Sequence, residues 1–401
     1  MKEPKIRFKG FQGEWETHAL SEYFKKVCDK NTKMECTIVL TNSAEHGIIP
    51  QNDFFDHAIA NNKNIGGYYI VSPDDFVYNP RVSVTAPVGP INRSLLDFQG
   101  VMSPLYLVFK INTINKDYLN IFYKTNKWHT FMKLEGNCGA RFDRLSISDD
   151  QFVKMPLTHP KDHSEQQSIA SYFQHLDSLI QSTTKKIESL KQVKAASLQS
   201  MFPQEGETTP RVRFKGFEGE WEKVRASNVF KTFNEKNRPD LPVLSATQDR
   251  GMVNRESIGY NIFHDKSNEA TYKHILPGQF IIHLRSFQGG FAHSSIEGIA
   301  SPAYTIMEFK DKTRHFDLYW KYIFVSKEFI KRLELITYGI RDGRSISFEE
   351  FSEMYFTVPS YEEQKKIASY ITTLDRQITL QTQRLEKLKQ IKAACLDNMF
   401  V

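Results

Sequence analysis

A ten-residue segment occurs twice in this chain with a single substitution. Residues 7–16 read RFKGFQGEWE, and residues 213–222 read RFKGFEGEWE. A longer match pairs residues 165–202 (EQQSIASYFQHLDSLIQSTTKKIESLKQVKAASLQSMF) with residues 363–400 (EQKKIASYITTLDRQITLQTQRLEKLKQIKAACLDNMF). Because both matches occur in the same order, the sequence indicates a tandem duplication of one domain of roughly 200 residues. We therefore expect two lobes related by pseudo-two-fold symmetry.

The longer match has the hydrophobic spacing of a coiled coil. Its apolar residues recur in steps of four and three for about three heptads in both copies. The predicted seam consists of Ile169, Phe173, Leu176, Ile180, Ile187 and Leu190 in the first copy and of Ile367, Ile371, Leu374, Ile378, Leu385 and Leu388 in the second. Each seam has one polar break, at Thr183 and at Gln381, and a polar seam residue can fix the helix register.

The two predicted helices are too long for one small lobe to bury. At 1.5 Å per residue, a helix of this length extends roughly 55 Å. Asp162 and Ser360 stand three residues before Glu165 and Glu363, which is the spacing of a capping box at each helix start. We expect an antiparallel helix pair; the alternative is two amphipathic helices that each lie on their own lobe.

The segments between the repeated ends share a plan and differ in detail. Three pairs of segments correspond: TIVLTNSAEHGIIPQ (37–51) with LPVLSATQDRGMVNR (241–255), PDDFVYNPR (73–81) with PGQFIIHLR (277–285), and GVMSPLYLVF (100–109) with GIASPAYTIM (298–307). Their β-branched and aromatic runs, broken by Gly and Pro, predict mixed strands with some helix. The intervening loops differ between copies, and loops on a rigid frame often carry binding residues. We expect the two lobes to recognise different targets of the same kind.

The expected fold class is α+β, with two globular mixed α/β target-recognition domains separated by two long helices in an antiparallel coiled coil. The predicted boundaries are 1–162 for the first domain, 163–202 for the first helix, 203–360 for the linker and second domain, and 361–401 for the second helix. The linker at 203–210 reads PQEGETTP, a composition typical of a domain boundary.

Composition and motifs exclude several classes. The 53 basic and 47 acidic residues give a net charge of only +6, so bulk charge alone does not indicate nucleic-acid binding. The sequence has no apolar run of about 18 residues and no signal segment near MKEPKIRFKG, so we expect a cytoplasmic protein. Cys28, Cys36, Cys138 and Cys395 form no CxxC pair, which favours reduced thiols over a zinc site. The chain also lacks phosphate-cradling glycine motifs and the Pro-Pro dipeptide of base-flipping methyltransferases, so we expect no catalysis and no bound metal.

The order of the repeated segments resembles the specificity subunit of type I restriction-modification enzymes along the whole chain. The resemblance rests on the paired RFKGF(Q/E)GEWE starts, the G-x-x-SP-x-Y segments, the Arg-containing segments before SIS, and the EQxxIASY helix heads. It implies a DNA-binding subunit in which each domain reads one half of a bipartite double-stranded DNA target, while the paired helices set the distance between them. It also implies partners: two methyltransferase subunits that modify adenine and, in restriction, an ATP-dependent translocase. S-adenosylmethionine, ATP and magnesium would belong to those partners.

Within this resemblance, side chains with paired donors or acceptors are candidates for base reading. These are Asn42, Ser43, Glu45, Arg81, Asn92 and Arg93 in the first lobe and Thr247, Gln248, Arg250, Asn254, Arg285 and Gln288 in the second. Arg141, Arg144, Arg341 and Arg344 belong to the shared frame and suit phosphate contacts. Two rival hypotheses are a coiled-coil scaffold that bridges two protein clients without touching DNA, and a self-sufficient nuclease or methyltransferase with an unrecognised centre.

Overall fold

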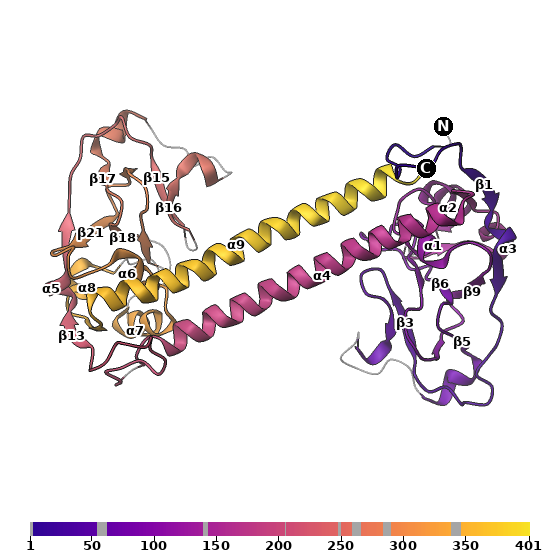
Figure 1. The fold of residues 1–401 in the computed structure, drawn as a ribbon, viewed down its shortest axis with the longest axis horizontal. Coiled ribbons are helices and arrows are strands. Elements are labelled where there is room, and N and C mark those ends of the chain that lie inside the picture. Colours follow the sequence, from indigo (N-terminus) through magenta and orange to yellow (C-terminus); the bar gives the residue numbers. More distant parts are fainter. Residues whose placement is uncertain are drawn as a thin grey trace. The chain divides into compact units, whose positions relative to one another are not determined.

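The computed structural model describes residues 3–53, 62–138, 143–204, 206–247, 250–258, 266–283, 290–337 and 346–401 (Figure 1). The chain divides into two compact units. Unit 1 comprises Met1–Thr184 and Gln383–Val401, and unit 2 comprises Lys185–Thr382. Each unit therefore contains one lobe, one half of its own long helix and one half of the other long helix.

Both units contain an antiparallel four-stranded sheet with the same strand order. In unit 1 the order is β2 (Phe24–Lys26), β9 (Leu107–Ile111), β6 (Phe76–Tyr78) and β7 (Ile91–Arg93). In unit 2 it is β14 (Phe230–Phe233), β21 (Thr305–Phe309), β18 (Phe280–Ile282) and β19 (Phe291–His293). This identity of order confirms that the duplication expected from the sequence is a duplication of fold.

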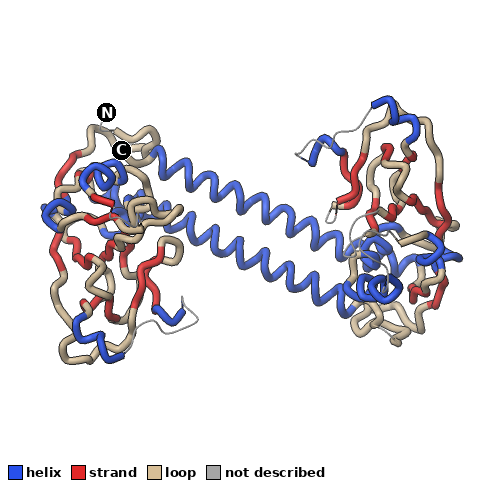
Figure 2. Tube along the Cα trace, turned by 180° about the vertical axis from the view of Figure 1, so that it is seen from behind, coloured by secondary structure: helices blue, strands red, loops and turns tan. Residues whose placement is uncertain are grey.

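Shorter two-stranded pairs surround each sheet, and long loops join them (Figure 2). In unit 1 they are β1 (Glu16–Ala19) with β12 (Pro156–His159), β3 (Leu40–Ser43) with β4 (Gly47–Pro50), β5 (Tyr69–Val71) with β8 (Gly100–Met102), and β10 (Asn137–Cys138) with β11 (Leu145–Ser146). In unit 2 they are β13 (Glu222–Arg225) with β22 (Tyr355–Val358), β15 (Leu244–Thr247) with β16 (Gly251–Asn254), and β17 (Lys273–Ile275) with β20 (Gly298–Ala300).

The short helices follow the same plan in both lobes. In unit 1 they are α1 (Lys116–Phe122), α2 (His129–Glu135) and α3 (Asp149–Phe152), with 3-10 turns at Leu20–Glu22, Gln51–Asp53 and Asn62–Gly67. In unit 2 they are α5 (Ala226–Val229), α6 (Asp317–Phe324), α7 (Lys327–Thr337) and α8 (Phe348–Ser352), with 3-10 turns at Arg255–Ile258 and Lys266–Thr271.

Each central sheet separates two hydrophobic cores, because alternate residues of a strand point to opposite faces. In unit 1, Phe76 and Phe109 pair on one face and belong to the larger aromatic core, while Val77 and Val108 pair on the other face and belong to the smaller one. In unit 2 the same registers carry Phe280 with Met307 and Ile281 with Ile306. The larger core is the one that also receives the long helices.

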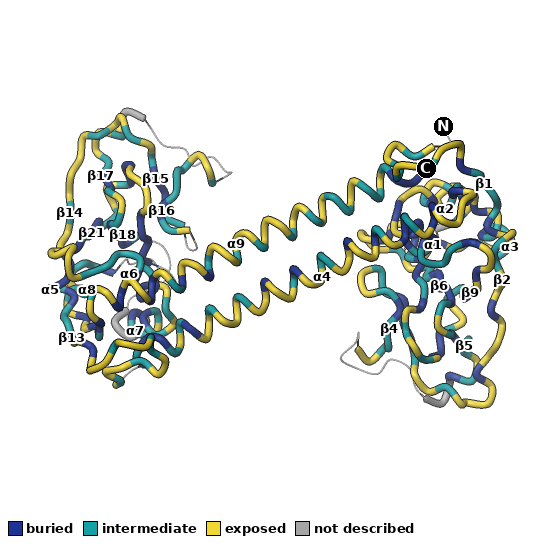
Figure 3. The backbone as a smooth tube through the Cα atoms, in the orientation of Figure 1, coloured by how far each residue is buried: buried dark blue, intermediate teal, exposed yellow. Residues whose placement is uncertain are grey.

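The two long helices predicted from the heptads are α4 (His163–Ser200) and α9 (Tyr361–Asn398). Buried or half-buried positions recur along α4 every three or four residues (Figure 3). Within unit 1 the two helices run antiparallel, since Asp177 pairs with Lys392 while Tyr172 lies beside Cys395. Within unit 2 the corresponding ion pair joins Lys194 to Asp375.

The last residues of the chain complete unit 1. Phe400 is 2% exposed and packs on Tyr118, Phe122 and Phe173, and the amide of Ile6 donates to the Asn398 carbonyl at 3.0 Å. In unit 2 the end of α4 fills the equivalent place. Phe202 stacks on Tyr319, and the amide of Val212 donates to the Ser200 carbonyl at 2.9 Å.

The expected capping boxes at the long helices are wrong. Asp162 does cap the start of α4, but its carboxylate accepts hydrogen bonds from the amide and hydroxyl of Ser164. The Glu165 and Glu363 carboxylates instead accept hydrogen bonds from arginine side chains (below). A capping box does form at α8, between Ser347 and Glu350.

Candidate nucleic-acid interface

The arginine and glutamate of the two repeated motifs clamp each lobe to the head of a long helix. Arg7 donates from Nε and Nη2 to the two carboxylate oxygens of Glu165 at 2.7 and 2.8 Å, and from Nη1 to the Gly13 carbonyl at 2.7 Å. Arg213 makes the same contacts with Glu363 and with the Gly219 carbonyl. Both glutamates are 1% exposed. Sequence reasoning did not assign these residues a role, although their identity in both copies was a signal.

The glutamine after each of these glutamates fixes the helix that follows the central sheet of its lobe, α1 in unit 1 and α6 in unit 2. Gln166 donates to the Pro160 carbonyl at 2.8 Å and accepts from the amide of Asn115, the N-cap residue of α1, at 2.9 Å. Gln364 donates to the Pro359 carbonyl at 3.0 Å and accepts from the amide of Phe316, the N-cap residue of α6, at 2.9 Å. The EQ dipeptides thus have a structural role in the described part of both lobes.

The β3–β4 and β15–β16 hairpins each end in a turn shaped by a hydroxyl group. Ser43 Oγ accepts from the amides of Glu45 and His46 at 3.3 and 3.2 Å. Thr247 Oγ1 accepts from the amide of Arg250 at 3.2 Å and donates to the Gly251 carbonyl at 2.8 Å. The hydroxyl groups of Ser43 and Thr247 therefore bond within the turn, whereas Glu45, His46 and Arg250 are exposed.

Both turns rely on glycine. Gly47 and Gly251 have a φ of +71°, in the left-handed region that glycine adopts without strain. At Gly251 a Cβ atom would also lie 2.3 Å from the His293 carbonyl oxygen. The two hairpins thus share their register and their glycine conformation, and the exposed residue before the glycine is His46 in unit 1 and Arg250 in unit 2.

The Asn42 and Asn92 amides are buried and satisfied inside unit 1. Both residues are 2% exposed. Asn92 Nδ2 donates to Asn42 Oδ1 at 2.6 Å and to the Ser43 carbonyl at 3.0 Å, while Asn42 Nδ2 donates to the Val77 carbonyl at 2.7 Å. In unit 2, Ala246 and Ala292 occupy the same register positions. We remove both asparagines from the base-reading set, because in this structure they hold the hairpin against the sheet.

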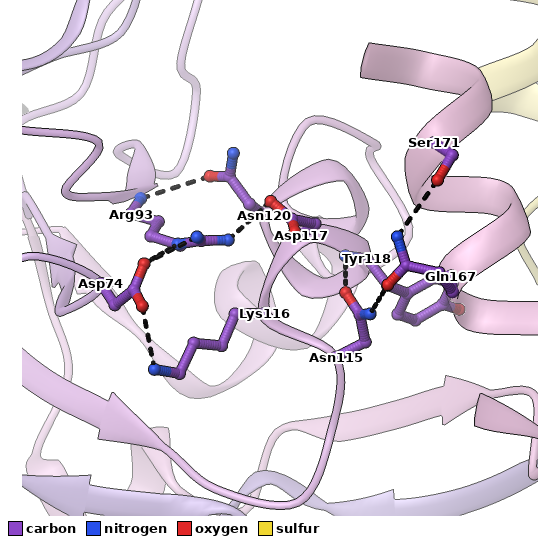
Figure 4. Close-up of polar contacts among 9 residues, drawn as sticks. All are labelled: Asp74, Arg93, Asn115, Lys116, Asp117, Tyr118, Asn120, Gln167 and Ser171. Atoms are coloured by element: carbon purple, nitrogen blue, oxygen red, sulfur yellow. Dashed lines mark hydrogen bonds and ion pairs between the residues drawn. The ribbon is translucent and has the colours of Figure 1, made fainter. Parts of the chain in front are cut away.

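Arg93 is held in an ion-pair network rather than presented to solvent (Figure 4). Its guanidinium lies 2.6 Å from Asp74 Oδ1 and 2.7 Å from Asp117 Oδ1, and its side chain is 13% exposed. Lys116 Nζ also donates to Asp74 at 3.2 Å. Burial opposes ionisation of Asp74, but the hydrogen bonds from Lys116 and Arg93 outweigh it and lower the pKa of this carboxyl. Arg93 therefore joins β7 to α1, and we remove it from the base-reading set.

Figure 4 also shows how α1 is attached to α4. Asn115 caps α1 by accepting from the Tyr118 amide at 3.0 Å, and its Nδ2 donates to Gln167 of α4 at 2.8 Å. Gln167 in turn donates to Ser171 at 3.1 Å. These contacts lie within unit 1 and fix the orientation of its first helix against the helix that carries the seam.

Arg81 and Arg144 are brought together by the fold. They form an isolated antiparallel bridge, flanked by hydrogen bonds from the Leu145 amide to the Pro80 carbonyl at 2.8 Å and from the Val82 amide to the Asp143 carbonyl at 2.9 Å. Both residues are exposed. The predicted base reader and the predicted phosphate contact of unit 1 thus occupy one surface.

Of the remaining candidates, one bonds within a turn and the others lie outside the described residues. Asn254 Oδ1 accepts from the Glu256 amide at 3.0 Å and so starts the 3-10 turn after β16. Six candidates lie outside the described residues: Gln248, Arg285, Gln288, Arg141, Arg341 and Arg344.

The seam residues are buried to different degrees. The buried ones lie near the lobes or the helix centre: Ile169, Phe173, Leu176, Ile187, Ile367, Ile371 and Leu374. The half-buried ones are Ile180, Leu190, Ile378, Leu385 and Leu388. Thr183, at the polar break of α4, is 5% exposed.

Within the described ranges, no cluster of three or more His, Cys, Asp or Glu side chains could hold a metal ion. In the same residues, no helix combines the length and apolar character needed to cross a membrane. A cavity of about 520 Å³ lies in unit 2 at the head of α9, lined in part by Glu218, Trp221, Arg314 and His315.

Comparison with known proteins finds a family model that matches part of the sequence and solved structures that share the fold. Residues 218–390 match the family described as Type I restriction modification DNA specificity domain. The crystal structure of the type I restriction-modification system S subunit from M. genitalium is similar over 100% of this chain and 99% of that one, with a TM-score of 0.58 and 12% identity. The HsdS subunit from Thermoanaerobacter tengcongensis is similar over 96% of each chain, with a TM-score of 0.48 and 14% identity. No curated protein matches the sequence closely.

The resemblance expected from the duplicated segments is thereby confirmed. Residues 218–390 contain a type I restriction-modification specificity domain, and the chain shares its fold with the M. genitalium S subunit.

Proposed function

We propose that this chain, with its type I specificity domain, recognises a bipartite, asymmetric DNA sequence through one half-site per unit. The observation that carries the proposal is the pair of hairpins β3–β4 and β15–β16. They have the same register and the same glycine geometry, but the residue before the glycine is His46 in one turn and Arg250 in the other. One frame thus presents two different side chains at the same position.

The different side chains of these turns favour an asymmetric target. A glutamate accepts a hydrogen bond from cytosine N4, whereas an arginine donates to O6 and N7 of guanine. Two units with the same tips would favour a palindrome. Glu45 and Arg250 are the base-reading candidates that we retain at the turns, together with Arg81 on the Arg81–Arg144 surface.

We further propose that the chain itself is not catalytic and that the chemistry belongs to partner subunits. Two methyltransferase subunits would bind equivalent surfaces of the two units, and a restriction translocase could join them. S-adenosylmethionine, ATP and magnesium would then be bound by the partners, and the complex would act on cytoplasmic DNA.

Exposed residues of the repeated motif support two equivalent partner surfaces. Lys9 and Glu14 are exposed in unit 1, and the identical Lys215 and Glu220 are exposed in unit 2. Arg7 and Trp15 are identical in both copies for a structural reason, since one forms the clamp and the other is buried. A lobe's own packing does not require identical exposed residues, so a partner of the same chemistry at both units accounts for them.

The experiment is a genome-wide map of N6-methyladenine in a host that expresses this chain with its methyltransferase partner, compared with the same host without this chain. We expect one new bipartite, asymmetric motif. Glu45→Ala should relax one half-site, and Arg250→Ala should relax the other. If no motif appears although the complex assembles, the chain does not direct methylation, and the scaffold hypothesis takes its place.

A further inference from the structure

An apolar side chain stands at the tip of a tight turn beside the Arg81–Arg144 pair. Val84 is 102% exposed relative to an extended reference, the highest value among the large exposed hydrophobic residues described. Its turn is closed by reciprocal backbone hydrogen bonds, from Ser83 to Ala86 at 3.0 Å and from Ala86 to Ser83 at 3.2 Å. Ser83 Oγ accepts a further hydrogen bond from the Ala86 amide at 3.1 Å. The turn therefore holds Val84 in one position.

The base of this turn is anchored in the core of unit 1. Val88 is fully buried, and the Tyr78 hydroxyl donates to its carbonyl at 3.0 Å. Gly89, at a φ of +80°, lies so close to Asn79 that a Cβ atom would be 2.1 Å from the Asn79 carbonyl oxygen. Because the turn is anchored in this way, the Val84 side chain is preorganised, and its contact with a ligand would cost little conformational entropy.

A single exposed valine on a protein surface is ordinary. Here, however, it lies three residues after Arg81, whose backbone bridges Arg144, and both arginines are exposed. Arginine side chains neutralise phosphates and position a protein on a duplex. A valine side chain cannot hydrogen-bond to a base edge. The apolar group that the major groove offers is the C5-methyl group of thymine.

We propose that Val84 reads a thymine methyl group in the half-site recognised by unit 1, while Arg144 contacts a flanking phosphate and the neighbouring Arg81 keeps its proposed role in base reading. This inference rests on the proposed DNA recognition and names one specificity-determining residue within it. The contact buries roughly one methyl group on the DNA side, for which about fourfold in affinity is expected. The loss should be the same whether the methyl group is removed from the DNA or its partner is removed from the protein.

The test uses the complex of the full chain with its methyltransferase subunits. The duplexes carry the motif that the N6-methyladenine map identifies. Each thymine of the motif is replaced in turn by uracil, which lacks only the methyl group. The wild-type complex should bind about fourfold more weakly at one thymine of one half-site. The Val84→Ala complex should bind the thymine duplex about fourfold more weakly, with no further loss on uracil replacement at that position.

The matched control is Leu134→Ala in the same unit, where an equally apolar side chain is 77% exposed on α2. It should keep the wild-type preference for thymine over uracil. Val84→Thr, which keeps the shape and adds a hydroxyl, gives a second variant with the same readout. Both Val84 variants change a fully exposed side chain and should unfold at the wild-type temperature.

Three outcomes would overturn the inference while leaving the proposed function intact. One is a motif in which no thymine-to-uracil change matters; another is an unchanged thymine preference in Val84→Ala. The third is a Val84→Ala defect that is equal at every sequence, which would indicate a phosphate or partner contact instead. Absence of any methylation motif, by contrast, would contradict the proposed function itself.

Discussion

Arg7 and Glu165 form a two-pronged ion pair across 158 residues of sequence, with N to O distances of 2.7 and 2.8 Å. Arg213 and Glu363 repeat it with the same distances. In both units the arginine lies in the repeated RFKGF segment and the glutamate at the head of a long helix. The two most similar segments of the sequence are therefore in contact in each unit, and their similarity has a mechanical explanation.

Replacing one arginine of this clamp should destabilise its unit strongly. Arg213→Met leaves the carboxylate of Glu363 buried without its partner, for which we expect a loss of about 3 to 5 kcal/mol in the free energy of unfolding. Denaturant unfolding followed by tryptophan fluorescence measures this, because Trp221 belongs to the core of unit 2.

Arg211→Gln is the control for the clamp, since Arg211 pairs with Glu207 on the surface and is 63% exposed. It should change stability by less than about 1 kcal/mol. The double variant Arg213→Met/Glu363→Met should recover most of the loss. Equal effects of Arg213→Met and Arg211→Gln would show that the clamp does not stabilise unit 2.

Stability of unit 2 should fall in mild acid because of His315. Burial, followed by the charge of Arg314, lowers the pKa of His315 to about 4, while the unfolded chain has a value near 6.5. Between these values the unfolded state binds more protons, so the free energy of unfolding rises with pH from about 4 to about 6.5 and this contribution is constant above. His315→Phe retains a ring beside Phe309 and Trp320 and should show a flatter profile in that window.

The measurement is the denaturation midpoint of both proteins at several pH values from 4 to 7. Other groups titrate in the same range, so the difference between the two curves is the relevant quantity. Parallel curves would contradict a role for His315.

Breaking the ion pair between Lys194 and Asp375 should lower the stability of unit 2, whereas reversing its charges should leave most of that stability in place. Lys194 and Asp375 lie 2.5 Å apart in unit 2, with side chains 27% and 35% exposed. Lys194→Asp places two carboxylates together and should cost roughly 1 kcal/mol, and the reversed pair Lys194→Asp/Asp375→Lys should restore most of it. A double-mutant cycle by thermal unfolding checks this; additive losses would mean that the two residues do not interact.

Half of the chain should associate with a second copy of itself. In unit 1 the buried Met399 and Phe400 come from the end of α9, and in unit 2 the buried Met201 and Phe202 come from the end of α4. Residues 1–204 alone contain one lobe and one such end, so two copies can complete each other. We expect a homodimer by light scattering, and Phe202→Ala within this half should weaken it. A folded, monomeric half-chain would rule out the exchange.

The duplication, the two long helices and their antiparallel direction could be predicted from the sequence because they depend on local periodicity and on identity between copies. The Val77 and Phe76 faces of the sheet, or the role of Arg7, could not be predicted in the same way. Those features depend on which distant segments meet, as Phe76 pairs with Phe109 and Arg7 with Glu165, and pairing of that kind leaves no periodic signal in a single sequence.

The candidate site shows the same division. The sequence alone determined that the loop around Arg93 differs between the copies and that the side chains of Asn42, Arg81 and Arg93 are of types that can read bases. Only the tertiary structure decided which of them are free to do so, because burial depends on neighbours distant in the chain: Asn42 faces Asn92, and Arg93 faces Asp74 and Asp117. The fold also brought Arg81 and Arg144 together and left Val84 exposed in a nearby turn, since the direction of a turn is fixed by the core residues that anchor it.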